Sequence, residues 1–380
     1  MELYWGDETL NLKLDSSKTV SQLPDANVPW TGKGFAEALE FPFNFPPLDQ
    51  CATPDDRVVV ALDPGTLALG FSFAILLERL LKAGIAAAQV TILLPSQTSD
   101  TSLAKILQEA AGCSVERHNP ADAMARMILG GTRDGRQIYL NRRLVEADLT
   151  IVVSGVRLGG GNQSPASLIY PGMACDVLSG VEAGTVLNLL GAPYLITAVP
   201  GPNGKAPHWF AGRMEAFRAA RDLHRSIWNL DLEEPVELIV LNWPKSSGPR
   251  EFANLATALE RFRPCLEPGG RFVIVCPEIS DTDDWQAMAS TYLDAVESSE
   301  TSQSAGSFTK TFKRWSRALR QGSIFILSSL ETDTCEDLQA HRLDRLSNIQ
   351  RLASAATTIL LIGDADRAMA KPAWQTLGDS

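Results

Sequence analysis

Short apolar runs alternate with longer, more polar stretches along this chain, and that alternation limits the folds it can adopt. The runs are rich in valine, isoleucine and leucine, which is typical of strands buried on both faces. They span residues 57–62, 90–94, 150–154, 194–199, 238–241, 271–276, 323–327 and 359–362. Between the first two runs, Phe73, Leu76, Leu77 and Leu80 recur at helical spacing. The pattern predicts an α/β protein with mainly parallel sheets.

The chain divides into two halves at an acidic stretch that ends in Pro235. A length of 380 residues suits two domains, and we place them at 1–232 and 236–380. The segment Met1–Leu14 alternates like a strand and is expected to close the edge of a sheet. Residues 297–307 are polar and poor in apolar side chains, so we interpret them as a loop that could act as a lid.

Charge and composition exclude several classes of partner. The net charge of -11 argues against nucleic acid or an anionic membrane as the main partner. No apolar run approaches the roughly 20 residues of a membrane-spanning helix, and the first residues lack the basic start and apolar core of a signal peptide. The six cysteines form no CxxC pair, which favours reduced, structural thiols. We therefore expect a cytoplasmic protein.

The stretch Thr150–Ala174 carries the most specific pattern in the chain. It runs from an apolar strand into a glycine-rich loop, 159–163, and leaves through Tyr170, Pro171 and Gly172. Backbone N–H groups of such a loop could hold a phosphate. The loop lacks the Lys-Ser/Thr of a P-loop and the G-x-G-x-x-G spacing of a dinucleotide fold, so a flexible connection is the simpler interpretation.

This stretch resembles the cofactor-anchoring segment of the nickel-pincer lactate racemase family, in which a strand precedes H-F-x-G-F-S-G-G-R-K and then L-P-G. Further segments resemble the family in the same order: Gly6–Leu10, Arg57–Asp63, His118–Asp122, Phe210–Ala216, Trp243–Lys245 and Pro268–Gly270. The resemblance implies a fold of two α/β domains with an interdomain cleft. It also implies racemisation of 2-hydroxyacids on a nickel-pincer nucleotide, with two histidine bases, a tethering lysine and a histidine ligand to nickel.

Carried over position by position, the resemblance places other residues where that chemistry is expected. The first base falls at Ser99, beside Asp100, and the tethering lysine falls at Ser167. The second base falls within 157–161, which holds no histidine, and the nickel ligand falls within 179–184, which holds none either. Asp63 is retained, but the arginine that follows it in the family is missing.

The candidate catalytic positions are therefore Asp63, Ser99 and Asp100, and we expect no metal ligands. The candidate ligand-contacting positions are Thr66, Ser96, Thr98, Arg157, Gly160, Asn162, Gln163 and Ser167. No cofactor is expected, and the nickel-pincer nucleotide would be present only if the tether lies elsewhere.

Three hypotheses for the function follow from these positions. The first is a degenerate or repurposed lactate racemase-like paralogue that binds a small molecule or a partner protein. The alternative is an active racemase or epimerase of the same superfamily with a different substrate and cofactor use. The third is a structural or regulatory subunit of an intact paralogue.

Overall fold

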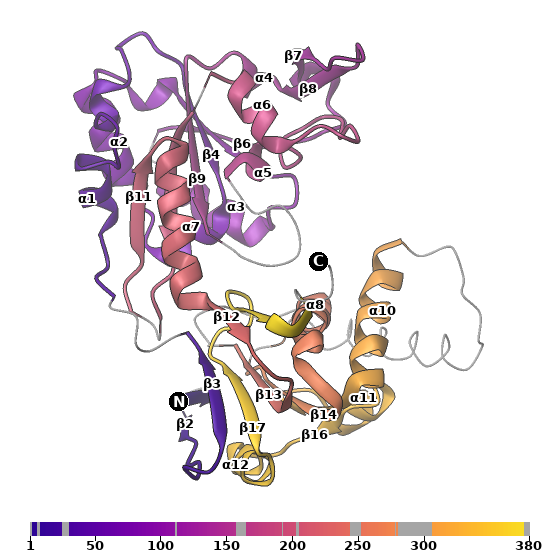
Figure 1. Cartoon of the computed structure of the whole chain (residues 1–380). Helices are drawn as coiled ribbons and strands as arrows, with labels where there is room; N and C mark the ends of the chain where they lie inside the picture. The colour runs from indigo at the N-terminus through magenta and orange to yellow at the C-terminus, as the bar shows by residue number, and fades with distance from the viewer. Residues whose placement is uncertain are drawn as a thin grey trace. The chain divides into compact units, whose positions relative to one another are not determined.

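The computed structural model describes residues 2–5, 8–24, 30–110, 112–156, 165–191, 193–202, 205–243, 252–277, 279 and 306–375. The chain forms two compact units (Figure 1). The first unit contains the described residues from 30 to 225, and the second contains residues 2–24 and those from 226 onward. Each unit is built on its own six-stranded sheet.

The sheet of the first unit is parallel except at one edge. Its strands, in spatial order, are β11 (His208–Gly212), β10 (Tyr194–Val199), β9 (Leu149–Gly155), β4 (Val58–Leu62), β5 (Val90–Leu94) and β6 (Ser114–Arg117). Only β11 runs antiparallel to its neighbour among these strands. A separate hairpin joins β7 (Arg126–Gly131) to β8 (Gln137–Asn141). The mainly parallel α/β fold predicted from the apolar runs is confirmed.

Helices cover both faces of this sheet, so alternate residues of each strand enter two separate cores. Helices α1 (Phe35–Glu40), α2 (Phe73–Lys82) and α3 (Asp100–Glu109) pack on one face. Helices α4 (Arg142–Val145), α5 (Pro165–Ile169), α6 (Ala183–Leu189) and α7 (Met214–Trp228) lie on the other. Short 3₁₀ segments occupy Leu48–Gln50, Pro64–Leu69, Ala87–Gln89 and Ala123–Ala125. In β4, Val58 and Val60 face the first core, whereas Val59 and Ala61 face the second.

The order in which the chain adds strands to the sheet reverses between β4 and β9. From β4 the chain adds β5 and β6 on one side, and it later adds β9 and β10 on the other. In open α/β sheets, ligands bind outside the carboxyl ends of the strands at such a switch point. The loops that follow β4 and β9 are therefore the first place to look for a functional site.

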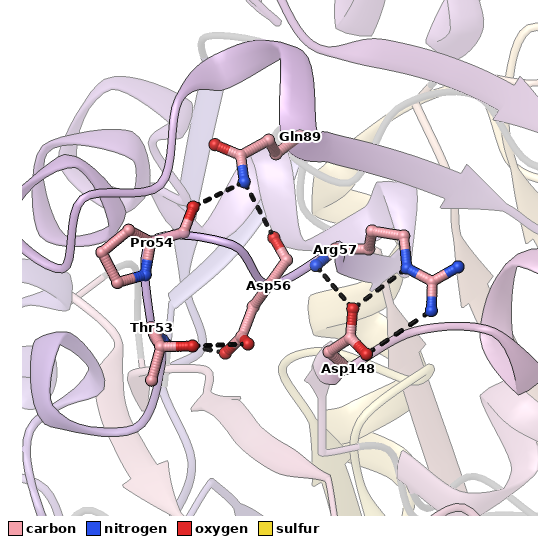
Figure 2. Close-up of polar contacts among 6 residues, drawn as sticks. All are labelled: Thr53, Pro54, Asp56, Arg57, Gln89 and Asp148. Carbon is pink, nitrogen blue, oxygen red and sulfur yellow. Dashed lines mark hydrogen bonds and ion pairs between the residues drawn. The ribbon is translucent and has the colours of Figure 1, made fainter.

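The amino ends of these same strands are fixed by polar contacts (Figure 2). Asp148 accepts hydrogen bonds from the backbone N–H of Arg57 at 2.9 Å and from its Nε at 3.0 Å. Nearby, the Gln89 amide donates to the carbonyl oxygen of Pro54 at 2.7 Å. These contacts join the loops that precede β4, β5 and β9.

The sheet of the second unit is wholly parallel. Its strands, in spatial order, are β16 (His341–Arg342), β15 (Gly322–Leu327), β14 (Leu266–Val275), β13 (Val236–Asn242), β17 (Thr358–Ile362) and β3 (Thr19–Leu23). The helices of this unit are α8 (Phe252–Phe262), α10 (Gly306–Gln321), α11 (Thr332–Asp337) and α12 (Leu346–Ala355), with 3₁₀ segments at Arg263–Cys265 and Ala373–Gln375. No helix in the described ranges is both long and apolar enough to cross a membrane.

The amino-terminal segment differs from its prediction. Residues 1–14 were expected to form one edge strand, but β1 (Glu2–Trp5) pairs only with β2 (Glu8–Asn11) in a hairpin. The edge strand is β3, which bonds along β17 from the second half of the chain. Residues 2–24 therefore pack with the second unit, whereas the predicted domains placed them in the first.

The segment predicted as the boundary between domains also has regular structure. Residues 229–232 form β12, which pairs with β18 (Met369–Pro372). The chain leaves the first unit after Arg225 and enters the second at Ser226. The predicted loop at 297–307 lies outside the described residues except for its last two, which begin α10.

Candidate functional site

The loop after β4 is held by its own hydrogen bonds. The backbone N–H of Asp63 donates to the carbonyl oxygen of Val153 at 2.9 Å, which extends the pairing of β4 with β9 by one residue. The Asp63 carboxylate accepts from the N–H of Gly65 at 3.0 Å, and the Thr66 hydroxyl donates to the Asp63 carbonyl at 2.7 Å. Thr66 is completely buried. Its hydroxyl therefore shapes the turn, and Asp63 is the side chain of this loop that faces the carboxyl edge.

In the loop after β5, the candidate residues Ser99 and Asp100 make structural contacts. Ser99 is the N-cap of α3, and its hydroxyl accepts from the N–H of Ser102 at 3.2 Å. Asp100 forms an ion pair with Arg117 at 2.8 Å, and Arg117 also donates to the carbonyl of Thr98 at 3.1 Å. The Asp100 side chain is 90% exposed. Both positions that align with the first base and its neighbour thus stabilise the start of α3.

Two hydroxyl side chains that the sequence did not single out lie on neighbouring strands at this edge. Ser154 of β9 and Thr197 of β10 are register partners on parallel strands, so both project to the same face of the sheet. Ser154 is 5% exposed and Thr197 is fully buried. Neither hydroxyl has a hydrogen-bond partner among the described residues. A buried polar group without a partner costs about 1–3 kcal/mol of stability.

Asp63, Ser154 and Thr197 lie side by side on three adjacent strands, and we call them the polar row. Leu62 is the register partner of Val153, so Asp63 stands beside Ser154 as Ser154 stands beside Thr197. The row crosses β4, β9 and β10 at the switch point. The residues two positions earlier in these strands, Ala61, Val152 and Leu195, are apolar and buried in the core on that face. The row is thus a local polar interruption of an apolar surface.

Thr98 is a further buried side chain at the carboxyl edge. It is 7% exposed, and its hydroxyl also lacks a hydrogen-bond partner within the described ranges. Ser96 precedes it in the same loop and is half-buried. Since β4 and β5 are neighbours, the structure brings the predicted residues of these two loops to one edge of the sheet.

The remaining predicted positions belong to the segment after β9. Arg157, Gly160, Asn162 and Gln163 lie outside the described residues. Ser167 lies on α5, which packs against β9 and β4. The predictions made for these residues as ligand contacts stay predictions.

His118 is buried and makes two polar contacts. Asn141 Nδ2 lies 3.1 Å from His118 Nδ1, and His118 Nε2 lies 3.0 Å from the carbonyl oxygen of Ala174. With the amide as donor to Nδ1, the ring is neutral and Nε2–H donates to Ala174. Burial lowers the pKa of His118, and the bond to Ala174 opposes that shift. The ring therefore links the end of β6 to the segment after α5.

The residues at this edge do not fit a nickel-pincer nucleotide. The position aligned with the tether is Ser167, whose hydroxyl cannot form the amide link that a lysine amine forms. Within the part of the chain that the structure describes, no group of three or more His, Cys, Asp or Glu side chains could hold a metal ion.

The fold and this edge define an α/β protein whose first unit is doubly wound about a switch point. Residues 5–174 match the family model described as the lactate racemase N-terminal domain. This part of the chain is therefore similar to the N-terminal domain of the lactate racemase family. None of the curated proteins compared matches it.

Two solved structures share the fold over most of the chain. The lactate racemase apoprotein of Thermoanaerobacterium thermosaccharolyticum is 14% identical, with a TM-score of 0.68 over 97% of this chain and 99% of that one. A protein of Thermotoga maritima is also 14% identical, with a TM-score of 0.53 over 83% of this chain and 93% of that one. At this identity the likeness concerns the fold.

Proposed function

We propose that this protein is a repurposed member of its family, which binds a small molecule at the carboxyl edge of the first sheet and does not racemise 2-hydroxyacids. The observation that carries the proposal is the use of Ser99 and Asp100. Ser99 caps α3, and Asp100 is paired with Arg117. A general base must have its proton-accepting atom within reach of the substrate. Ser99 is instead engaged with the start of α3, and Asp100 with Arg117 at the end of β6.

Two features at the carboxyl ends of the strands support the binding of a ligand. The doubly wound sheet keeps its switch point between β4 and β9. Buried hydroxyls without partners stand beside it, at Ser154 and Thr197. Such groups are normally satisfied by protein, water or ligand, so their position favours a bound polar molecule.

The proposal is tested by assaying racemisation directly. The full chain is expressed together with the enzymes that make the nickel-pincer nucleotide, purified, and incubated separately with D-lactate and L-lactate. A family member that carries the histidines and the lysine serves as the positive control. We expect no interconversion of the lactate enantiomers above the rate without protein, whereas interconversion at a rate near that of the control would refute the proposal.

A further inference from the structure

We propose that two copies of this chain associate through the edge of β7, with their β7 strands paired antiparallel about a two-fold axis. The hairpin of β7 and β8 is a two-stranded sheet of its own at the periphery of the first unit (Figure 1). Within the described ranges, β8 is the only strand that pairs with β7. The other edge of β7 is therefore open.

The hydrogen bonds of β8 show which backbone groups lie at this open edge. The N–H of Asn141 donates to the carbonyl oxygen of Met173 at 3.1 Å. The carbonyl oxygen of Tyr139 accepts from the N–H of Cys175, also at 3.1 Å. These groups of β8 thus point away from β7. Since Ile128 is the register partner of Tyr139, the two form a non-hydrogen-bonded pair, and the N–H and C=O of Ile128 point away from β8.

The side chains around this edge are apolar and exposed. Ile128 lies on β7 itself, and Met124 precedes the strand. Val177 lies near them, because its neighbour Asp176 forms an ion pair with Arg126 of β7. An exposed apolar edge with open backbone groups is a template for pairing with another strand.

The edge strand β6 of the large sheet is protected against such pairing, whereas β7 is not. The charged residues of β6, Glu116 and Arg117, form ion pairs with Arg143 and Asp100. Charged side chains on an edge strand disfavour pairing with another chain. Residues 127–131 of β7 carry no charge.

The charges that flank β7 favour a second copy as the partner. Asp122 lies before the strand and Arg133 after it, and both side chains are exposed. Neither forms an ion pair within the part of the chain that the structure describes. In an antiparallel pair the start of one strand lies beside the end of the other, so Asp122 of each copy would approach Arg133 of the other. These two contacts make the edge attractive to a second copy although the whole chain carries a net charge of -11.

Sedimentation velocity of the full chain at concentrations from about 1 to 100 μM tests this proposal. The edge variant is Ile128→Pro, which removes an N–H that points away from β8 and so breaks no bond of the hairpin. The control is Leu107→Lys, at an exposed apolar residue of α3 in the same unit. Circular dichroism checks that each variant is folded.

Two further measurements do not depend on the folding of the proline variant. Arg133→Asp is compared with the exchanged pair Arg133→Asp and Asp122→Arg. Hydrogen exchange of the unmodified protein at low and high concentration locates the interface, with the peptide that contains β6 as the internal control.

We expect the unmodified protein and Leu107→Lys to dimerise reversibly with a dissociation constant on the order of 10 μM, because the open edge is short. Ile128→Pro and Arg133→Asp should each weaken the dimer about tenfold, and the exchanged pair should restore it. Exchange should slow with concentration in β7 and not in β6. A monomer at every concentration, a dimer unaffected by Ile128→Pro and Arg133→Asp, or slower exchange in β6 alone would overturn the proposal. None of these results depends on racemisation or on a bound ligand.

Discussion

Arg57 and Asp148 join the amino ends of β4 and β9, the two strands between which the first sheet changes direction. The Asp148 carboxylate accepts from both the backbone N–H and Nε of Arg57 (Figure 2). The Asp148 N–H donates back to the Arg57 carbonyl at 3.0 Å. The strands are thus fixed in register at the edge opposite the polar row. This fixed register places Asp63 beside Ser154.

Replacing Asp148 with Asn should make the free energy of unfolding fall less steeply as the pH is lowered in the acid range. Hydrogen bonds from the Arg57 side chain and backbone lower the pKa of Asp148 below its ordinary value of 3.8. The Asp148 carboxylate therefore binds a proton at a higher pH in the unfolded chain than in the folded chain. Its contribution to the free energy of unfolding is present above pH 3.8 and is lost as the pH falls below that value. Urea unfolding of Asp148→Asn across this range should show a shallower loss than the unmodified protein.

Replacing His118 with Gln should remove a pH dependence near neutrality. Because burial lowers the pKa of His118 below 6.5, the unfolded chain takes up a proton before the folded chain does. Its contribution to stability is therefore full above pH 6.5 and is lost as the pH falls below that value. The free energy of unfolding should fall between pH 7.5 and 5.5 more steeply in the unmodified protein than in His118→Gln. Loss of the two hydrogen bonds should lower stability by about 1–3 kcal/mol at pH 7.5.

The matched control for His118 is His341→Gln, at an exposed ring on the edge strand β16. At pH 7.5 it should lower the stability less than His118→Gln does, because the His341 ring is exposed and its centroid lies 4.9 Å from that of Phe325. If the His118 and His341 variants behave alike, the buried network does not have the role described.

Replacing Thr197 with Val should leave stability unchanged or raise it by about 1 kcal/mol, because the change removes a buried group without a partner. Thr358→Val should lower stability by about 1 kcal/mol, because it leaves Glu237 N–H without its acceptor. The measurement is urea unfolding of both variants at pH 7.5. A loss of several kcal/mol in Thr197→Val would mean that its hydroxyl is satisfied in solution without a ligand.

The apolar runs predicted most of both sheets, because strands buried on two faces need continuous apolar sequence. Residues 90–94 and 194–199 coincide with β5 and β10. The edge strand β3 was missed because Thr19–Leu23 is half polar and buried only at its last residue. Its place in the sheet depends on β17, more than 330 residues away in sequence.

The candidate site was predicted less completely, for a related reason. Sequence identified the loops after β4 and β5, including Asp63 and Thr98, from the resemblance to the family. It did not show that Arg117 pairs with Asp100, since the contact joins two different strand ends. Nor could it place Ser154 beside Thr197, which requires the register of β9 and β10. The sequence signal that could have pointed to these two residues is a hydroxyl side chain inside each of the apolar runs that form β9 and β10.

The central proposal is that this chain has the lactate racemase fold without the cofactor chemistry of that family. It is tested most directly by the intact mass and nickel content of the full chain after expression with the enzymes that make the nickel-pincer nucleotide. A family member with the tethering lysine is treated identically as the control. We predict the mass of the unmodified polypeptide and no nickel above background, while the control gains both. A mass increase with stoichiometric nickel in this chain would contradict the account and would place the tether at a residue other than Ser167.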